Sequence, residues 1–430
     1  MTSAAIPLPP DAASPDASAF RVTVTGVDRP GVTARMFASL TGATVVDVEQ
    51  VVVAGQLILG AVVRARPTAR ADLEARLSIA VPDFEVTVSE LPVGAAADVP
   101  GATANCTVTI VGRAIGAGDV SLLATTIATD GGNITRIDRI AEYPVTVIAL
   151  EVAAPDVDLL RRDLAERGTT LGVDVAVRPR GLVRRGVHLV VMDVDSTLIQ
   201  DEVIELLARF AGREAEVRAV TEAAMRGELD FAESLHARVA QLAGLPEDVV
   251  DRARAAVRLT PGARTLCRTL RRLGYRIALV SGGFHEVVDP IALELGVHEV
   301  RANRLEISDG RLTGRVLGPV IDRAAKAAAL REFTAAYGID PACTIAIGDG
   351  ANDLDMLSAA GLGIAFNAKP VVQAAADSAI NVPYLDTVLY LMGISRAEVE
   401  QADLLDGAVA MPGSAMRERP GPARPAALSE

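Results

Sequence analysis

Three short apolar runs in the C-terminal half of the chain each end in polar residues. Residues 187–192 lead into Asp193-Val194-Asp195, residues 276–280 into Ser281-Gly282-Gly283, and residues 344–347 into Gly348-Asp349. Helical stretches separate the runs, which favours parallel strands buried on both faces. Ligands of such sheets bind beyond the carboxyl ends of the strands. The sequence therefore predicts an α/β unit whose functional site is assembled from three distant segments.

Asp193, Asp195 and Asp349 bring three carboxylates to this predicted site. The chain turns just past a strand's end, so both Asp193 and Asp195 can reach one pocket. Converging carboxylates repel one another unless a cation lies among them, and an all-oxygen ligand set suits Mg²⁺. We expect these three residues to hold the metal, with Asp193 as nucleophile and Asp195 as general acid and base. An isolated pair of this kind is often a helix cap, but three converging clusters disfavour that alternative.

Two further segments supply groups that suit a phosphate. Ser281 and Gly282 follow a predicted strand, so a hydroxyl and neighbouring amides can hold a phosphate oxygen. Lys326 lies near the start of an Ala-rich helical stretch and supplies positive charge. Alone, the first would be a turn and the second a solvated lysine. Their order relative to the aspartates favours a phosphate-binding role.

These segments together resemble the haloacid dehalogenase superfamily, whose phosphatases carry DxDx(T/S), a Ser or Thr, a Lys and GDxxxD in that order. The matching residues are Asp193-Val194-Asp195-Ser196-Thr197, Ser281, Lys326 and Gly348-Asp349-Gly350-Ala351-Asn352-Asp353. The dehalogenase branch lacks the second acidic residue, so Asp195 indicates phosphoryl transfer. The resemblance implies that Asn352 contacts the phosphoryl group or orients the site. It also implies that Asp353 supports Lys326 or the metal ligands.

The segment between the first two motifs, about residues 200–260, shows apolar residues at helical spacing and predicts a small helical cap. With Asp193 to Glu202 and the stretches 225–231 and 234–239, it resembles the phosphoserine phosphatase family. That family's substrate is O-phospho-L-serine, hydrolysed to L-serine and phosphate through an aspartyl-phosphate in the last step of serine biosynthesis. The resemblance implies that Glu202 meets the substrate ammonium and Arg238 its carboxylate. A different small phosphomonoester, or an amino-acid-sensing regulatory role, remains the alternative.

The N-terminal half contains the same pattern of elements twice, about 86 residues apart, over residues 19–95 and 103–180. Each copy has the order βαββαβ. Both copies resemble ACT domains, the first through the turn Thr25 to Val32, while the second lacks the matching Asp and Pro. The resemblance implies an amino-acid effector, such as serine, bound between modules of two chains, and a homodimer. Dimerisation or packing modules without a ligand are the alternative.

Composition sets outer limits on the function. The 42 basic and 55 acidic residues give a net charge of −13, which argues against a nucleic-acid partner. No run of 18 apolar residues and no signal peptide is present, so we expect a cytoplasmic protein without a membrane partner. Three scattered cysteines suggest neither disulfides nor a zinc site.

The predicted fold class is α/β, with a Rossmann-like parallel-sheet phosphatase core and a small helical cap, preceded by two ferredoxin-like βαββαβ (ACT) domains. The phosphatase is expected over residues 186–398. Residues 1–18 and 399–430 are expected to be loose tails, because they are rich in Ala, Pro and Ser or charged residues with little that can pack.

Overall fold

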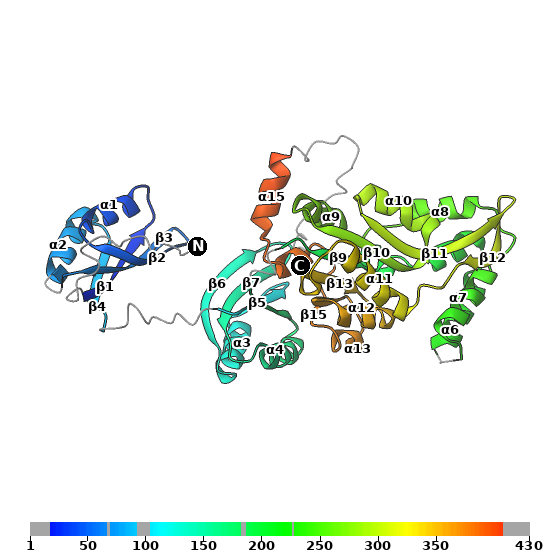
Figure 1. Cartoon of the computed structure of the whole chain (residues 1–430), viewed down its shortest axis with the longest axis horizontal. Coiled ribbons are helices and arrows are strands. Elements are labelled where there is room, and N and C mark those ends of the chain that lie inside the picture. The colour runs from blue at the N-terminus through cyan, green and yellow to red at the C-terminus, as the bar shows by residue number, and fades with distance from the viewer. Residues whose placement is uncertain (1–17, 67–68, 93–103, 182–185, 226–227, 407–430) are drawn as a thin grey trace, which may run out of the picture. The chain divides into compact units, whose positions relative to one another are not determined.

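The computed structural model describes residues 18–66, 69–92, 104–181, 186–225 and 228–406. The chain divides into two compact units, residues 1–102 and 103–430 (Figure 1). Of the two predicted tails, residues 1–17 and 407–430 lie outside the described residues. No helix in the described ranges is long and apolar enough to cross a membrane.

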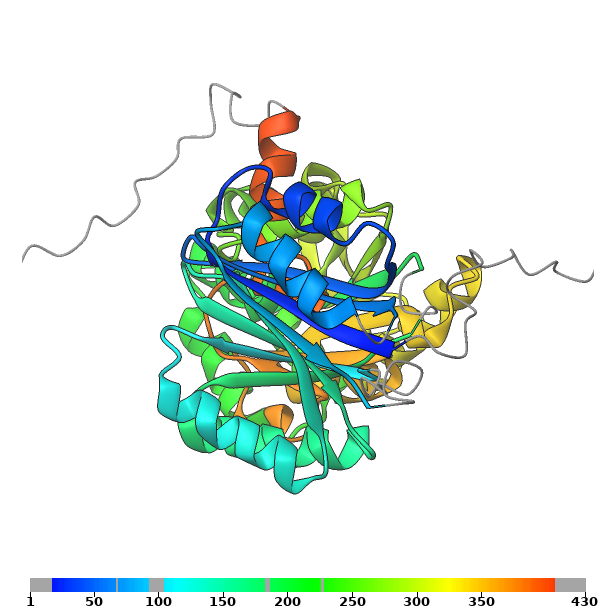
Figure 2. The ribbon, with the colours of Figure 1, turned by 90° about the vertical axis from the view of Figure 1, so that its left-hand side faces the viewer.

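The first unit is a four-stranded antiparallel sheet with both helices on one face (Figure 2). Its elements are β1 (Ser18–Val27), α1 (Val32–Ser39), β2 (Thr44–Val53), β3 (Gln56–Ala65), α2 (Arg70–Ala80) and β4 (Glu85–Glu90). The strand order is β2-β3-β1-β4. Phe20, Val22 and Val24 alternate with less buried residues along β1 and pack in the core with Met36 and Leu77 of the helices. The predicted βαββαβ order is confirmed.

The second unit begins with a repeat of the same arrangement. Its elements are β5 (Cys106–Gly112), α3 (Ala117–Thr129), β6 (Asn133–Ala141), β7 (Thr146–Ala153), α4 (Val157–Leu171) and β8 (Asp174–Pro179). The strand order β6-β7-β5-β8 matches that of the first unit position by position. The predicted internal duplication is therefore confirmed at the level of topology.

A seven-stranded sheet of order β12-β11-β10-β9-β13-β14-β15 forms the rest of the second unit. Its strands are β9 (Leu189–Met192), β10 (Arg276–Phe284), β11 (Glu299–Ser308), β12 (Arg311–Leu317), β13 (Thr344–Gly348), β14 (Leu362–Phe366) and β15 (Ser378–Ile380). All neighbours pair in parallel except β11 and β12. Along β9, Val190 and Met192 pack into one core while Leu189 and Val191 pack into another. Burial on both faces explains the uninterrupted apolar run.

Helices flank this sheet and complete the two cores. They are α9 (Ala263–Arg272), α10 (His285–Leu295), α11 (Arg323–Ala336), α12 (Leu354–Ala359), α13 (Pro370–Gln373), α14 (Thr387–Leu391) and α15 (Arg396–Leu405). Buried residues of α9 and α10 belong to the first core, and those of α11 and α12 to the second. The predicted parallel α/β unit is confirmed.

The helical cap follows the first strand, as the sequence predicted. Its helices are α5 (Val203–Ala211), α6 (Glu214–Met225), α7 (Phe231–Ala240) and α8 (Asp248–Ala256). Val203, Leu206 and Leu207 of α5 are buried in one core with Leu235 of α7 and Val249 of α8. The side chains of residues 225–227 lie outside the described part of the structure.

The predicted C-terminal tail, residues 399–430, is wrong over its first residues. Helix α15 begins with a capping box at Ser395 and Glu398 and continues to Leu405. Asp403 of this helix pairs with Arg268 and Arg272 of α9. Because charged pairs rather than an apolar stripe hold this helix, its sequence lacked the periodic signal of a packed element.

Candidate active site

The carboxyl ends of β9, β10 and β13 meet beneath the cap, as the sequence predicted. A cavity of about 480 Å³ lies there. The predicted site residues that line it are Asp193, Asp195, Glu202, Arg238, Gly282, Asp349 and Asn352. Ser281, Lys326 and Asp353 are buried and lie behind this lining. The fold therefore brings together, around one cavity, residues from a 161-residue stretch of the sequence, positions 193 to 353.

A buried lysine joins two of the aspartates. The Lys326 ammonium lies 2.8 Å from Asp193 Oδ2 and 2.7 Å from Asp353 Oδ1. None of the Lys326 surface is exposed. Burial opposes its charge, but the two carboxylates outweigh burial and raise the pKa of Lys326. Burial and the charge of Asp353 raise the pKa of Asp193 well above its usual range, although Lys326 works against them.

The environment of Asp195 brings its pKa close to neutral pH. Its Oδ1 accepts a hydrogen bond of 2.9 Å from the backbone N–H of Val203, at the start of α5. Burial and the nearby Glu202 carboxylate raise the pKa of Asp195 to about 7. Such a group is ready both to donate and to accept a proton.

Asp349 completes the carboxylates that face the cavity. Its Oδ1 accepts a hydrogen bond of 2.9 Å from Thr197 Oγ1. Burial raises its pKa to about 6 against the effect of that hydrogen bond. One oxygen each from Asp193, Asp349 and Asp353 lie within 4.8 Å of one another. The sequence analysis named Asp193, Asp195 and Asp349 as ligands and gave Asp353 a supporting role, so the cluster shares two of the three expected ligands.

The end of β10 presents a hydroxyl and backbone amides. Gly283 N–H donates to Ser281 Oγ at 2.8 Å, and Asn303 Nδ2 donates to the Gly282 carbonyl at 2.8 Å. A Cβ on Gly283 would lie 3.0 Å from Ser281 Oγ and 3.1 Å from Asp195 Oδ2, so a side chain there would crowd both groups. The turn therefore stays close to the carboxylates without covering them.

Two charged residues of opposite sign line the cap side of the cavity. Glu202 accepts a hydrogen bond of 3.0 Å from Ser196 Oγ. Arg238, on α7, donates to the carbonyl of Ser234 but forms no ion pair with a carboxylate among the described residues. Burial lowers its pKa, while Glu202 and Asp195 oppose that effect. A partly buried guanidinium without a carboxylate partner is suited to binding a ligand's carboxylate.

Gly348 shows why the last motif begins with glycine. A Cβ at this position would lie 2.4 Å from Asp353 Cγ. Asp353 Oδ2 also accepts a hydrogen bond of 3.0 Å from Gly350 N–H. Any larger residue at 348 would thus displace the carboxylate that holds Lys326.

Sequence reasoning assigned no role to the residues that connect these groups. Thr197 holds Asp349, and Ser196, with a φ of 56°, holds Glu202. Asp201 receives hydrogen bonds from the backbone N–H and the guanidinium of Arg258, at 3.0 and 2.8 Å. The first two lie inside the recognised motif, so their position was a usable signal. The contact between Asp201 and Arg258 spans 57 residues and carried no pattern.

Comparisons with known proteins agree with this arrangement. Residues 190–358 match the haloacid dehalogenase-like hydrolase family, and residues 19–89 and 104–178 each match an ACT domain family. A phosphoserine phosphatase of Streptomyces coelicolor is 54% identical over 91% of this chain and 96% of its own length. Phosphoserine phosphatase SerB2 of Mycobacterium tuberculosis is 49% identical over 90% and 95%.

A solved structure supports the same relationship. The crystal structure of a probable phosphoserine phosphatase from Vibrio cholerae, in unliganded form, superposes with a TM-score of 0.55 at 31% identity, over 69% of this chain and 88% of that one. High identity over nearly the full length, together with the buried Asp193–Lys326–Asp353 group, places the chain among known enzymes. The chain belongs to the phosphoserine phosphatase family, with two ACT domains before a haloacid dehalogenase-like hydrolase domain.

Proposed function

We propose that this protein is a phosphoserine phosphatase that hydrolyses O-phospho-L-serine to L-serine and phosphate. One observation carries the substrate assignment: Glu202 and Arg238 line the same cavity as Asp193, Asp195 and Asp349. Phosphoserine has an ammonium, a carboxylate and a phosphate, and the cavity offers a partner for each. The 54% identical relative from Streptomyces coelicolor bears the same activity in its name.

The proposed reaction proceeds in two steps. An Asp193 oxygen attacks phosphorus, the bond from phosphorus to the serine oxygen breaks, and Asp195 donates a proton to that oxygen. Asp195 then takes a proton from the water that attacks the aspartyl-phosphate, which releases phosphate and restores Asp193. The pKa of Asp195, raised to about 7 by burial and Glu202, suits both transfers.

Lys326, Ser281 and the Gly282 segment would hold the phosphoryl oxygens during both steps. Lys326 is fixed in position by Asp353, whose other oxygen is held by Gly350 N–H. Ser281, near the carboxyl end of β10, is fully buried. Asn352 lines the cavity next to Asp349 and would contact the phosphoryl group or orient it. These assignments rest on position and on the family motifs.

The carboxylates also fit a Mg²⁺ ion. The raised pKa values of Asp193 and Asp349 have burial as their main cause, and crowding with Asp353 adds to it. A cation would relieve that crowding, and oxygen ligands suit Mg²⁺. We propose that Asp193 and Asp349 hold the ion, and the ligand role of Asp195 stays a prediction. Bound there, Mg²⁺ would neutralise charge on the phosphoryl oxygens and keep Asp193 ionised.

Replacing the two cap charges tests the substrate assignment. Glu202→Ala and Arg238→Ala should each lower kcat/KM for phosphoserine by about a hundredfold, the effect of losing a charge-assisted contact in a partly buried site. Hydrolysis of an aryl phosphate, which lacks the ammonium and the carboxylate, should change far less when each variant is assayed at its own pH optimum, because the loss of Glu202 also lowers the pKa of Asp195. Arg218→Ala, at an exposed arginine of the cap outside this cavity, is the matched control. Equal losses on both substrates would indicate a general phosphatase instead.

For the ACT domains we propose feedback by an amino acid such as serine, bound near the turn Thr25 to Val32 between two chains of a homodimer. The turn lies between β1 and α1, where Gly31 has a φ of 88° and precedes the helix N-terminus. Measuring phosphoserine hydrolysis and molecular mass with and without serine tests this. No change in either quantity would contradict it.

A further inference from the structure

The cavity beneath the cap contains a hydroxyl that no step proposed above uses. Ser234, on α7, lines this cavity together with Arg238 of the same helix. The two residues are four positions apart, so they lie on the same face of the helix, one turn from each other. Ser234 is only 4% exposed. It is thus a buried polar residue next to the guanidinium that the substrate assignment depends on.

The Ser234 hydroxyl has no hydrogen-bond partner among the residues that the structure describes. Serines in helices often donate to the carbonyl one turn earlier, as Ser39 and Ser78 do in this chain, both at 2.9 Å. Ser234 Oγ forms neither that bond nor any other within the described ranges. Thr221, which also brings a hydroxyl to the lining, donates to the Val217 carbonyl at 3.1 Å. The Ser234 hydroxyl therefore keeps its donor for another molecule.

This unpaired hydroxyl is accessible from the cavity. Unpaired polar atoms without accessible surface do occur in the described part of the chain, for example Ser378 Oγ and Thr269 Oγ1, but Ser234 Oγ is not one of them. The small surface that Ser234 exposes therefore includes its hydroxyl, and this residue lines the cavity. A buried hydroxyl is normally paired, because burial removes the hydrogen bonds it made to water. A ligand in the cavity can supply the missing partner.

Arg238 brings a cation next to this hydroxyl. Long side chains of a helix point back toward its N-terminus and cover the preceding turn. The Arg238 side chain does so, because its Nε donates to the Ser234 carbonyl at 3.3 Å. Its terminal N–H groups form no bond to any residue in the described ranges. The guanidinium and the hydroxyl therefore offer unpaired donors on the same turn of α7.

A carboxylate is the ligand group that suits these donors. Its two oxygens together accept about four hydrogen bonds, and a bidentate guanidinium uses only two of those places. A neighbouring hydroxyl can fill a third. The adjacent guanidinium would repel an ammonium, so the Ser234 hydroxyl is placed to meet the anionic end of an amino acid and not its cationic end.

We propose that Ser234 is a specificity-determining residue whose hydroxyl donates a hydrogen bond to the substrate carboxylate, beside Arg238. This inference rests on the function proposed above and deepens it, because phosphoserine carries the carboxylate that Arg238 would bind. A substrate without that carboxylate leaves both the hydroxyl and the guanidinium unpaired in a partly buried site. Leaving such groups unpaired is what makes an enzyme reject the smaller analogue.

Steady-state kinetics of the full-length protein on two substrates test the proposal. O-phosphoethanolamine is phosphoserine without its carboxylate, so it keeps the ammonium and the phosphate. Ser234→Ala should lower kcat/KM for phosphoserine by about tenfold, mainly through a higher KM, because one hydrogen bond to a charged group is lost. The kcat/KM for phosphoethanolamine should stay within about twofold of the wild-type value, since that substrate never uses the hydroxyl. An equal loss on both substrates, or no loss on either, would overturn the proposal.

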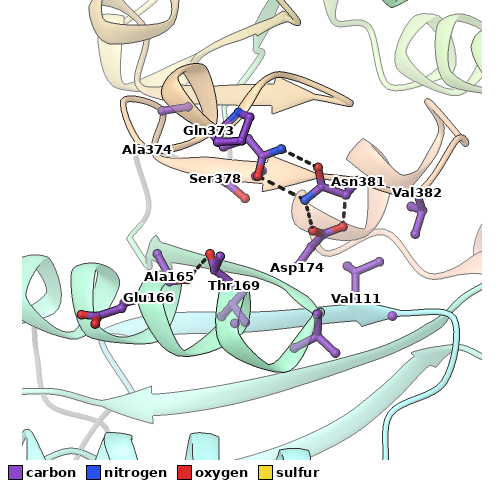
Figure 3. A pocket seen from close by; sticks show the side chains of 18 of the residues that line it. Val111, Ala165, Glu166, Thr169, Asp174, Gln373, Ala374, Ser378, Asn381 and Val382 are labelled. Carbon is purple, nitrogen blue, oxygen red and sulfur yellow. Dashed lines mark hydrogen bonds between the residues drawn. The ribbon is translucent and has the colours of Figure 1, made fainter.

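Ser378→Ala is the matched control. Ser378 lies on β15, where the phosphatase sheet meets the second ACT domain (Figure 3). It is 5% exposed and also has an unpaired hydroxyl, but it does not line the cavity beneath the cap. This variant should leave kcat/KM unchanged for both substrates. A loss on phosphoserine equal to that of Ser234→Ala would show a general effect of removing a buried hydroxyl and would contradict the proposal.

A double variant places the hydroxyl on the same carboxylate as Arg238. Both residues would bind one group, so in an Arg238→Ala background Ser234→Ala should cost less than about a further twofold on phosphoserine. A further loss of about tenfold there would mean that Ser234 acts elsewhere, which would overturn the proposal. A wild-type enzyme without a preference for phosphoserine over phosphoethanolamine would contradict the proposed function itself. A preference that is present but unaltered in Ser234→Ala would contradict this inference alone.

Discussion

Lys326 is a lysine without exposed surface, held between Asp193 and Asp353. Removing a charge from water is costly, so such a lysine is stable only with close anionic partners. Both carboxylate oxygens of Asp353 accept hydrogen bonds, one from Lys326 and one from Gly350 N–H. Asp353 is therefore suited to holding Lys326 in place rather than to reacting with a substrate. Asp193 lines the cavity, so it can contact a substrate there, as a nucleophile must.

Asp353→Ala should destabilise the protein by about 3 to 5 kcal/mol, because it leaves a buried ammonium with half of its counter-charge. The free energy of unfolding in urea measures this loss. Asp355→Ala, two residues further along, removes an exposed partner of Arg323 and should cost no more than about 1 kcal/mol. Similar values for the two variants would show that the buried group does not constrain the fold.

At the scale of elements, two linkers join the cap to the core and are bonded to each other. Gln200 N–H donates to the Arg258 carbonyl, and Thr260 N–H donates to the Leu198 carbonyl, both at 2.9 Å. Asp201 and Arg258 add a side-chain pair across the same linkers. Burial works to raise the pKa of Asp201, but hydrogen bonds from Arg258 outweigh it and lower the pKa. The linkers thus determine the positions of Glu202 and Arg238 relative to the aspartates that line the same cavity.

Arg258→Ala should raise KM for phosphoserine by about three- to tenfold, since the exposed arginine is partly screened by solvent. The KM for an aryl phosphate, which does not use the cap charges, should change little. Arg254→Ala, at an exposed arginine of α8 paired with Asp251, is the matched control. A loss of kcat on both substrates without a change in KM would contradict a positioning role for the linkers.

The sequence predicted elements where one physical signal dominated. Strand β9 is buried on both faces and reads as an apolar run, and α5 has a single apolar face. The hairpin of β11 and β12 was not predicted, because its residues are partly exposed and interrupted by charges. Site residues that follow strand ends were predicted, whereas Thr197, Asn303 and Arg258 were not. Thr197 lies inside the recognised motif, so a signal for it existed, whereas Asn303 and Arg258 act through contacts between distant segments, which one sequence does not display.

At the scale of the whole molecule, the first unit exposes an apolar strand edge. Strand β2 lies at the edge of its sheet, and its valines at 45, 46, 48, 51, 52 and 53 are 41–57% exposed. An exposed apolar edge strand tends to pair with another chain. This edge supports the proposed homodimer.

Val52→Asp should shift the protein from dimer to monomer in sedimentation analysis at low micromolar concentration, because a buried charge opposes association. Ile79→Asp, at an 80% exposed position on α2, introduces the same charge away from that edge and should leave the dimer intact. A dimer that survives Val52→Asp would place the contact elsewhere.

The most direct test of the account is phosphate release from phosphoserine by the wild type and by Asp193→Asn, with circular dichroism to confirm that both are folded. Asn keeps the size of the side chain but loses the nucleophilic charge, so turnover should fall by about a thousandfold or more while the fold is retained. A folded Asp193→Asn variant that releases phosphate at the wild-type rate would contradict the central role of this carboxylate.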